Sequence, residues 1–293
     1  MANKYLYSLL GIGFTVCAFA VIATNYDKLS GSFSNKETVP NGLMTVTETD
    51  YPITSENPHT KRKTKEKDAM HTIHDTIQDY RHKNAYSIVD VSEFSKSDIK
   101  KLFTISDISD EVFKRMYKKS YKENCTVPRD TLRYIRVLHK DIEGNTRIGE
   151  LVVNKSIADD VKTIFYKLYL HDYPIEKMVL VDAYDADDNA SMADNNSSSF
   201  NYRVVEGTTH LSKHSLGLAI DINPRYNPYI HTLNGQTVCS PENGNDYVDR
   251  TKDFPYKIDT DDYAYKLFLE YGFSWGGNWN SSKDYQHFQI DAE

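Results

Sequence analysis

The chain has 293 residues, of which 39% are hydrophobic and 26% charged, enough for one sizeable core or two small ones beside non-globular segments. Its formal net charge is -7, and the basic stretch at residues 61–67 is interrupted and lies in polar sequence. Binding along nucleic-acid phosphates needs a continuous basic stripe, so no nucleic-acid partner is expected.

An apolar run extends from Tyr5 to about Ala23 and is followed by polar sequence. Its length lies between that of a long signal-peptide core and that of a short membrane span. We therefore expect residues 1–24 to be an export signal, either a signal peptide or, as we favour, an uncleaved membrane anchor. The expected location is the cell envelope, in the periplasm or at the cell surface, with the membrane contacted through this segment. In such a compartment Cys125 and Cys239 could pair, which the sequence leaves open.

The next segment, residues 25–85, is rich in Ser, Thr, Lys and Glu and contains Pro40, Pro52 and Pro58. Its few apolar residues are not clustered, so it cannot bury a core, and a flexible polar tether is predicted. Residues 86–124 contain short amphipathic pieces and are expected to form a helical lead-in without visible chemistry.

Residues 125–293 mix strand and helix patterns and are expected to form the main domain. Two β-rich runs, residues 132–138 and 148–153, flank a turn signal and predict a β-hairpin. A helix capped by Ser156 should follow, because apolar residues recur at the helical period up to Leu168.

Further elements are expected along the same domain. Residues 178–181 predict a buried strand, and residues 185–199 are so rich in Asp, Asn and Ser that a solvated loop beside the substrate is expected. A last helix should begin with Thr260 as its cap and stop at Gly272. Together these elements predict an α+β fold with a largely antiparallel sheet flanked by helices.

The segment 212–223 places His214 and Asp221 on either side of a short turn that contains Gly217. Zinc accepts imidazole nitrogen and carboxylate oxygen, and a catalytic site keeps three protein ligands so that water can take the fourth position. His287, at the start of an expected terminal strand, supplies the third ligand. The chain is therefore expected to bind one Zn²⁺ through His214, Asp221 and His287.

Asp284 lies three residues before His287, where its carboxylate can lean over the metal without binding it. A carboxylate beside a zinc-activated water can remove the proton and later deliver it to the leaving amine. The resulting oxyanion needs a cation or donor besides the metal, and Arg203 is the candidate. Trp279 lies in a polar segment and is expected in the substrate cleft, whereas core packing and a cleft position are equally open for Trp275.

Two patterns in these residues resemble those of the zinc peptidases of peptidoglycan, a family that includes D-Ala-D-Ala carboxypeptidases and dipeptidases and L-Ala-D-Glu endopeptidases. The fold of this family is shared with the zinc-binding hedgehog signalling domain. The patterns are S-x-H-x-x-G-x-A-x-D and D-x-x-H, filled here by Ser212, His214, Gly217, Ala219, Asp221, Asp284 and His287. The resemblance extends over residues 125–289.

The resemblance implies the same three zinc ligands, with Asp284 as general base and acid at a position where many members carry Glu. It also implies that Arg203 steadies the scissile carbonyl and that Ser212 assists substrate placement or the ligand shell. The fold that it implies for residues 125–293 is the hedgehog-like zinc fold.

The expected function is that of a zinc metallopeptidase, a hydrolase that cleaves a peptide bond in the peptidoglycan stem by attack of metal-bound water. The sequence does not choose between D,D- or L,D-carboxypeptidase and endopeptidase, and a monomer is expected. The alternative is a non-catalytic zinc-fold module that binds cell-wall peptide. Such a module would tend to lose the base or the cation, so the presence of Asp284 and Arg203 favours the enzyme.

Overall fold

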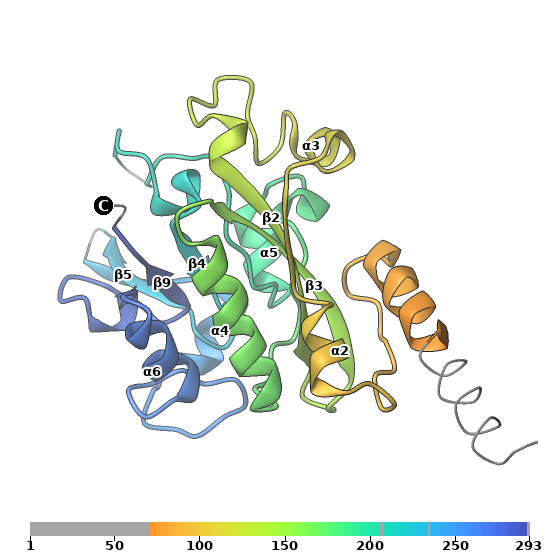
Figure 1. Ribbon diagram of the computed structural model, residues 1–293. Helices are drawn as coiled ribbons and strands as arrows, with labels where there is room; N and C mark the ends of the chain where they lie inside the picture. Colours follow the sequence, from red (N-terminus) through yellow and green to blue (C-terminus); the bar gives the residue numbers. More distant parts are fainter. Residues whose placement is uncertain (1–70, 206–207, 234, 292–293) are drawn as a thin grey trace, which may run out of the picture. The chain divides into compact units, whose positions relative to one another are not determined.

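The computed structural model describes residues 71–205, 208–233 and 235–291 (Figure 1). The export signal expected at residues 1–24 lies outside these ranges, as does most of the expected tether. Within the described ranges, no helix combines the length and the apolar character that crossing a membrane requires.

The end of the range expected to be a tether is helical, since residues 71–82 form a helix. Ile77 is buried in the main core, and Ile73 and Tyr80 pack against that core. These side chains recur every three to four residues, which gives the helix one apolar face despite its polar composition. The Arg136 guanidinium donates to the Tyr80 carbonyl at 3.3 Å, so this helix is also joined to the neighbouring sheet.

The later elements follow in a mixed order along the chain. The α-helices are α2 (Lys96–Lys100), α3 (Asp110–Met116), α4 (Ala158–Leu170), α5 (Asp188–Ala193) and α6 (Tyr263–Glu270). The 3-10 helices are η1 (Arg129–Thr131), η2 (Val181–Tyr184), η3 (Lys213–Leu216), η4 (Glu242–Tyr247) and η5 (Gly276–Asn278). The strands are β1 (Thr104–Asp107), β2 (Leu132–Lys140), β3 (Thr146–Asn154), β4 (Ala219–Asp221), β5 (Tyr229–Leu233), β6 (Gln236–Ser240), β7 (Ser274–Trp275), β8 (Lys283–Asp284) and β9 (His287–Gln289).

The described strands pair into three sheets, with the orders β1-β2-β3, β4-β9-β7 and β6-β5-β8. All of these pairings are antiparallel. The predicted hairpin is present, because β2 and β3 pair along their whole length from Leu132 opposite Asn154 to Lys140 opposite Thr146. The expected α+β class with antiparallel pairing is confirmed.

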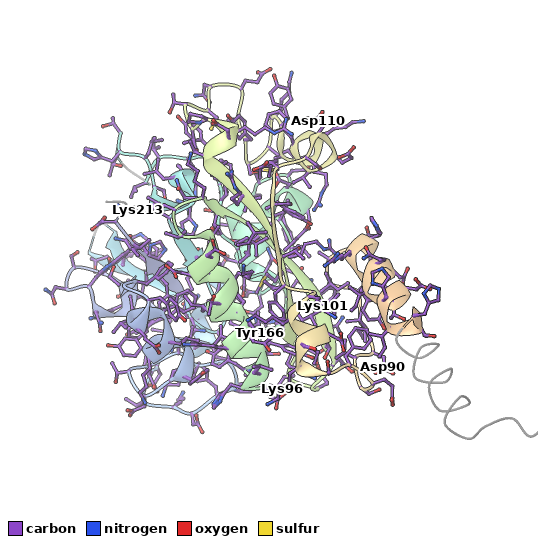
Figure 2. The ribbon with its side chains drawn as sticks, viewed as in Figure 1. Asp90, Lys96, Lys101, Asp110, Tyr166 and Lys213 are labelled. Atoms are coloured by element: carbon purple, nitrogen blue, oxygen red, sulfur yellow. The ribbon has the colours of Figure 1, made fainter. Side chains whose placement is uncertain are left out.

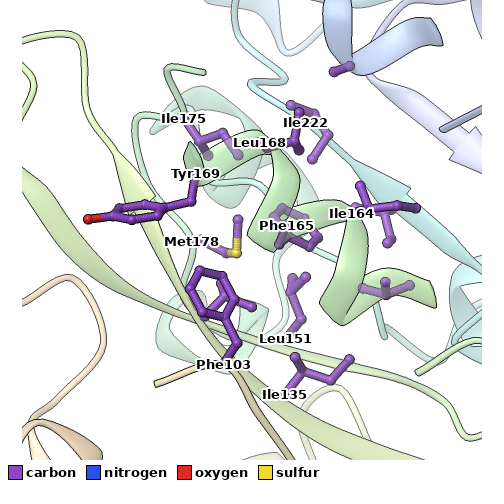
Figure 3. Packing of buried hydrophobic residues seen from close by; sticks show 14 of the residues in the cluster. Phe103, Ile135, Leu151, Ile164, Phe165, Leu168, Tyr169, Ile175, Met178 and Ile222 are labelled. Carbon is purple, nitrogen blue, oxygen red and sulfur yellow. The ribbon is translucent and has the colours of Figure 1, made fainter. Parts of the chain in front are cut away.

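One core connects the hairpin with the strands near the C-terminus. α4 lies against the first sheet and beside α6 (Figure 1). The rings of Phe165 and Phe268 meet edge-on with their centres 6.4 Å apart. Ile164 and Leu168 of α4 belong to the same buried cluster as Ile222, which follows β4 (Figure 3). Because burying a side chain of this size contributes about 1.5–3 kcal/mol, this cluster fixes β4 relative to the hairpin.

Short helices do form in the range expected as a helical lead-in. Tyr166 on α4 donates through its hydroxyl to the carbonyl of Lys96 in α2 at 3.4 Å (Figure 2). The ring of Phe103, which follows α2, meets the Tyr166 ring edge-on at 5.1 Å. α3 is capped by Ser109, whose hydroxyl accepts the Val112 N–H at 3.3 Å.

Two expected helix caps are wrong. α4 begins after Ile157, and the Ser156 hydroxyl donates instead to Asn154 Oδ1 at 3.0 Å. α6 is capped by Asp262 rather than Thr260. Polar side chains near a helix start have several local hydrogen-bond partners to choose from, and Ser156 bonds Asn154 so that no side chain caps α4.

The segment expected as a buried strand, residues 178–181, is buried around Met178 but is not a strand. It meets β3 through the hydrogen bond from the Glu150 N–H to the Met178 carbonyl, 3.0 Å long. Val181 then begins η2. The expectation was wrong because a run of buried apolar residues of this length does not require a strand ladder.

The range expected as a solvated loop, residues 185–199, contains α5, and Asn195, Asn196 and Ser197 within it are buried. The Asn196 side chain accepts the Val179 N–H at 2.8 Å and donates to the Val179 carbonyl at 3.0 Å. The Asn196 amide thus makes the two hydrogen bonds to Val179 that a neighbouring strand would otherwise make. The loop expectation was wrong because polar side chains were assigned to solvent when they satisfy buried backbone groups.

Candidate metal centre and active site

The second sheet brings two of the expected zinc ligands onto one face. Asp221 at the end of β4 lies directly opposite His287 at the start of β9. Directly paired residues of antiparallel strands project to the same side of the sheet. Their neighbours Ile220 and Phe288 are also paired, project to the other side and are fully buried in the core. The alternation of these strands therefore places core on one face and ligands on the other.

The third expected ligand, His214, is supplied by the 3-10 helix η3. Ser212 caps this helix, and its hydroxyl accepts the His214 N–H at 3.3 Å. Gly217 ends the helix with a φ of 66°, which an L side chain rarely adopts. The turn returns the chain so that His214 Nε2 lies 3.2 Å from Asp221 Oδ2.

The three side chains converge on one point. His287 Nδ1 lies 3.0 Å from Asp221 Oδ1 and 3.1 Å from His214 Nε2. Around a tetrahedral zinc with ligand bonds of about 2.0–2.1 Å, any two ligand atoms lie about 3.3 Å apart. His214, Asp221 and His287 are all buried and can hold a metal ion in this arrangement.

The outer nitrogens of both imidazoles fix which inner nitrogens are free. His214 Nδ1 lies 2.6 Å from the Ser199 carbonyl oxygen, and His287 Nε2 lies 3.0 Å from Gln289 Oε1. Both oxygens can only accept, so the ring protons lie on these outer nitrogens. Two bare imidazole nitrogens and a carboxylate then face one another, an arrangement that only a cation or a proton between them can stabilise. The donor set therefore fits a zinc ion.

The electrostatics of the cluster favour a positive charge between its side chains. Burial by itself would raise the pKa of Asp221, but His214 and His287 hold it far below its usual range. Burial by itself would lower the pKa of His287, but the Asp221 carboxylate raises it to about 9. Both shifts have the same physical cause, the mutual attraction of a buried carboxylate and positive charge, which a metal ion would also satisfy.

Asp284 approaches the same centre from another sheet. It lies in β8, directly opposite Tyr229 of β5, three residues before His287. Its Oδ1 is buried and has no hydrogen-bond partner among the described residues. Burial raises the pKa of Asp284 to about 7, with His287 and Arg203 opposing the shift and Asp221 adding to it. A carboxyl group that titrates near neutral pH is suited to accept and return a proton.

Gly276 packs closely against Asp284 and His287. The sequence analysis did not identify this residue as part of the site. A Cβ atom added there would lie 2.7 Å from the Asp284 carbonyl oxygen and 3.3 Å from His287 Cβ. Real side chains do not tolerate the shorter contact, so only glycine allows η5 to pack on this segment. The sequence signal was the Trp275-Gly276-Gly277 run after the last helix.

Arg203 and Ser212 lie next to each other beside η3. The Arg203 N–H donates to Ser215 Oγ at 2.7 Å, and the Ser212 N–H donates to the Arg203 carbonyl at 3.0 Å. The Arg203 side chain forms an ion pair with Asp188 of α5. Ser212 is buried and serves as the cap of the ligand-bearing helix, so its place in the structure is beside the ligand shell.

The two tryptophans differ in position. Trp279 is half-buried, and its ring centre lies 5.4 Å from that of His287. Trp275 is buried in the core, and its indole N–H donates to the Tyr285 carbonyl at 2.8 Å. Of the two alternatives left open for Trp275, core packing is therefore the one observed, while Trp279 lies beside the ligands.

Several groups that orient the site have no counterpart in the sequence analysis. Ser199 acts through its main-chain carbonyl, a group that every residue has and that the residue type therefore cannot indicate. Gln289 is two residues beyond His287 and so projects to the same face of β9, a relation that strand alternation could have indicated. Asp188 was considered as part of an acidic loop and not as a partner of Arg203. Outside the site, Cys125 and Cys239 are free thiols and do not form the disulfide that the sequence left open.

The comparison with known families concerns the C-terminal part of the chain. Residues 206–290, less than a third of the chain, match a family model described as D-alanyl-D-alanine carboxypeptidase. No curated protein and no solved structure matches the chain. The matched segment contains the three ligands and Asp284, whereas Arg203 lies just before it. The resemblance to these peptidases is confirmed over this segment, and the match supports a peptidase.

Proposed function

We propose that the chain is a zinc-dependent peptidase that hydrolyses a peptide bond in the peptidoglycan stem, as a D,D- or L,D-carboxypeptidase or an endopeptidase. The observation that carries this proposal is the convergence of His214 Nε2, Asp221 and His287 Nδ1 at 3.0–3.2 Å, with both outer ring nitrogens already committed to acceptors. A zinc ion held there would supply a Lewis acid that activates water and polarises a carbonyl.

The residues around this centre divide the remaining work. Asp284 accepts the proton of the attacking water at Oδ1 and returns it to the nitrogen of the leaving amine. Arg203 donates to the carbonyl oxygen on which negative charge develops. Ser212 holds η3 and thereby His214, and Trp279 provides an aromatic wall beside His287. The free Oδ1 of Asp284 supports this assignment, because a base needs an unoccupied acceptor atom.

The proposal extends to the setting of the enzyme. Residues 125–293 form the peptidase domain with a hedgehog-like zinc fold, which the ligand-bearing antiparallel sheet β4-β9-β7 supports. The apolar run within residues 1–24 exports the chain or anchors it to the membrane, and residues 25–85 supply the spacer, shortened by the helix at residues 71–82. The chain then acts as a monomer on stem peptides in the cell envelope.

The rival function is that of a non-catalytic module that binds wall peptide through the same zinc fold. The test compares the purified chain with its Asp284→Asn variant. We expect each to bind about one zinc per chain, measured by elemental analysis, because Asp284 is not a ligand. Turnover of muropeptides, followed by mass spectrometry, should fall by about 10²–10⁴-fold in the variant.

The matched control is Asp261→Asn, which removes the same charge from a side chain that is 99% exposed. This variant should keep both zinc and turnover. A wild-type chain that binds zinc and peptide but leaves muropeptide masses unchanged would establish the binding module. A chain without zinc would contradict both functions.

A further inference from the structure

The Asp188 carboxylate holds both ends of the short segment that carries Arg203. Its Oδ1 accepts the Asn201 side-chain N–H at 2.8 Å, and its Oδ2 forms an ion pair with Arg203 Nε. Tyr202 between them is buried. The backbone of the same segment is fixed from the other side, since the Asn201 N–H donates to the His214 carbonyl at 3.3 Å. Asp188 therefore belongs to a chain of contacts that ends at a zinc ligand.

The geometry of a guanidinium group decides what such a contact can do. An Arg side chain presents Nε and two Nη groups in one rigid plane. A carboxylate paired with Nε restrains the position of this group by charge attraction and leaves both Nη groups available. Among the described residues, Asp188 is the only carboxylate paired with Arg203, whose side chain keeps 33% of its surface exposed. The Arg203 charge also opposes the rise in the pKa of Asp284 that burial causes, so the guanidinium lies within electrostatic reach of Asp284.

The position of Asp188 is fixed by the start of a capped helix. Asp188 begins α5, which Asp187 caps by accepting the Ala190 N–H at 3.0 Å. Before α5, the Asp182 carboxylate accepts the Ser120 N–H at 2.9 Å and the Ser120 hydroxyl at 3.0 Å. The contacts with Ser120 connect η2, which packs against α5, to the part of the chain that precedes the hairpin.

We propose that Asp188 is a positioning residue that orients the Arg203 guanidinium so that its two Nη groups face the scissile carbonyl. The inference rests on the proposed function, and it adds a residue that lies before the segment matching the family model. Asp188 does not touch substrate in this assignment. Its contribution is that the donor is already in place before negative charge develops, which avoids reorganisation during the reaction.

The test is a double-mutant cycle on kcat/KM, with Asp188→Asn, Arg203→Ala and the double variant. Asp188→Asn keeps the shape of the side chain and removes the charge that holds Nε. We expect it to lower kcat by about 10–100-fold with a smaller change in KM, because an oriented oxyanion donor acts mainly in the transition state. In the Arg203→Ala background, the same change should cost less than about 2-fold.

The matched control is Asp185→Asn, which removes the same charge from the same stretch at a side chain that is 86% exposed and paired with Lys119. It should leave kcat and zinc content unchanged. As a second measurement, added guanidinium chloride should restore activity to Arg203→Ala more effectively when Asp188 is intact than in the double variant.

Each other result overturns the inference. Additive losses in the cycle would show that Asp188 acts independently of Arg203. Wild-type activity of Asp188→Asn would show that the contact has no effect, and increased activity would show that Asp188 withholds Arg203 from substrate. An inactive wild-type chain would instead refute the proposed function, which separates the two failures.

Discussion

Residues 71–205 and residues 206–290 divide the molecule into a part that builds the scaffold and a part that carries the chemistry. The first part supplies the hairpin and α4. The second supplies the three candidate metal ligands and Asp284, and it is the part that matches the family model. Yet the carbonyl that orients His214 and the carboxylate that holds Arg203 both come from the first part. The candidate metal ligands thus all come from the second part, whereas their orientation depends on both parts.

The two parts also share their main core. Phe165 from the first part meets Phe268 from the second, and Leu151 and Ile220 belong to the same buried cluster. Ile220 of β4 therefore shares one core with α4 and the hairpin. A disturbance at the junction should therefore affect stability and the metal site together, which the following substitutions test in order of decreasing effect.

Gly217→Ala should produce the largest effect, because this residue lies at the junction. Its φ is 66°, and an added Cβ would lie 2.6 Å from the Asn154 N and 2.9 Å from the Val153 carbonyl carbon in β3. The Asn154 N–H donates to the Gly217 carbonyl at 2.8 Å, so moving it away would break the contact between this turn and β3. We expect the free energy of unfolding to fall by about 2–5 kcal/mol, the sum of a left-handed backbone cost and an overpacking cost. Urea unfolding measures the loss, and zinc binding should weaken with it.

The matched control is Gly144→Ala in the β2–β3 turn. That glycine has a similar φ of 83°, but nothing lies within 4 Å of its added Cβ. It should therefore show the left-handed backbone cost alone, about 1–2 kcal/mol. Equal losses at the two positions would mean that the contact between η3 and β3 contributes nothing.

Glu150→Gln tests the first part alone and should have a smaller, pH-dependent effect. The buried Glu150 carboxylate on β3 accepts from Arg115 Nη1 at 2.9 Å and from the Tyr134 hydroxyl at 2.6 Å. Burial opposes ionisation, but Arg115 outweighs it and lowers the pKa of Glu150 below its usual range. Stability from this group is then fully present above the unfolded pKa, about 4.3, and is lost as pH falls through the lower folded pKa.

The expected loss of unfolding free energy at pH 7 is about 1.5–3 kcal/mol, the usual contribution of hydrogen bonds to a charged group. Urea unfolding at several pH values should show the gap to wild type closing below about pH 4.3. Glu143→Gln, an exposed position in the neighbouring turn, is the control and should change little. A gap that persists unchanged into acid would contradict the assignment to ionised Glu150.

The contrast between the two parts also explains what the sequence could predict. Periodicity predicted the hairpin and the body of α4, because each has a long, regular apolar pattern. The convergence of His214, Asp221 and His287 was predictable because zinc chemistry restricts both the type and the number of its ligands. The strand expected at residues 178–181 was wrong, since its backbone partners are the Asn196 side chain and the edge of β3.

Other features depend on contacts that no local pattern carries. The helix at residues 71–82 was hidden by polar composition, although three of its side chains reach the core. Asn196 and Ser197 looked like solvent-exposed loop residues until the backbone groups they satisfy were known. The orienting role of the Ser199 carbonyl is a property of the fold, because every residue has such a group.

Gln289→Met should have the smallest effect on stability. It tests how the His287 ring is oriented by a contact within the second part alone. The two ligand imidazoles are oriented differently: the acceptor for His214 is a main-chain carbonyl that no substitution removes, whereas the acceptor for His287 is the Gln289 side chain, 3.0 Å from Nε2. Removing this acceptor frees the ring to rotate or to carry its proton on Nδ1. We expect the zinc Kd to rise by about 10–100-fold, as for other partners that orient metal ligands.

A competition titration against a chromophoric chelator at fixed pH measures this change, and urea unfolding of the zinc-free chain should shift by less than about 0.5 kcal/mol. Gln289→Glu provides the comparison, because a carboxylate still accepts from Nε2 and should retain zinc affinity. If Gln289→Met bound zinc as tightly as wild type, the cluster of Asp221, His214 and the sheet register alone would suffice to orient His287. The strand pairing that both parts of the chain stabilise would then orient the ligands, and no single hydrogen bond would be needed for their orientation.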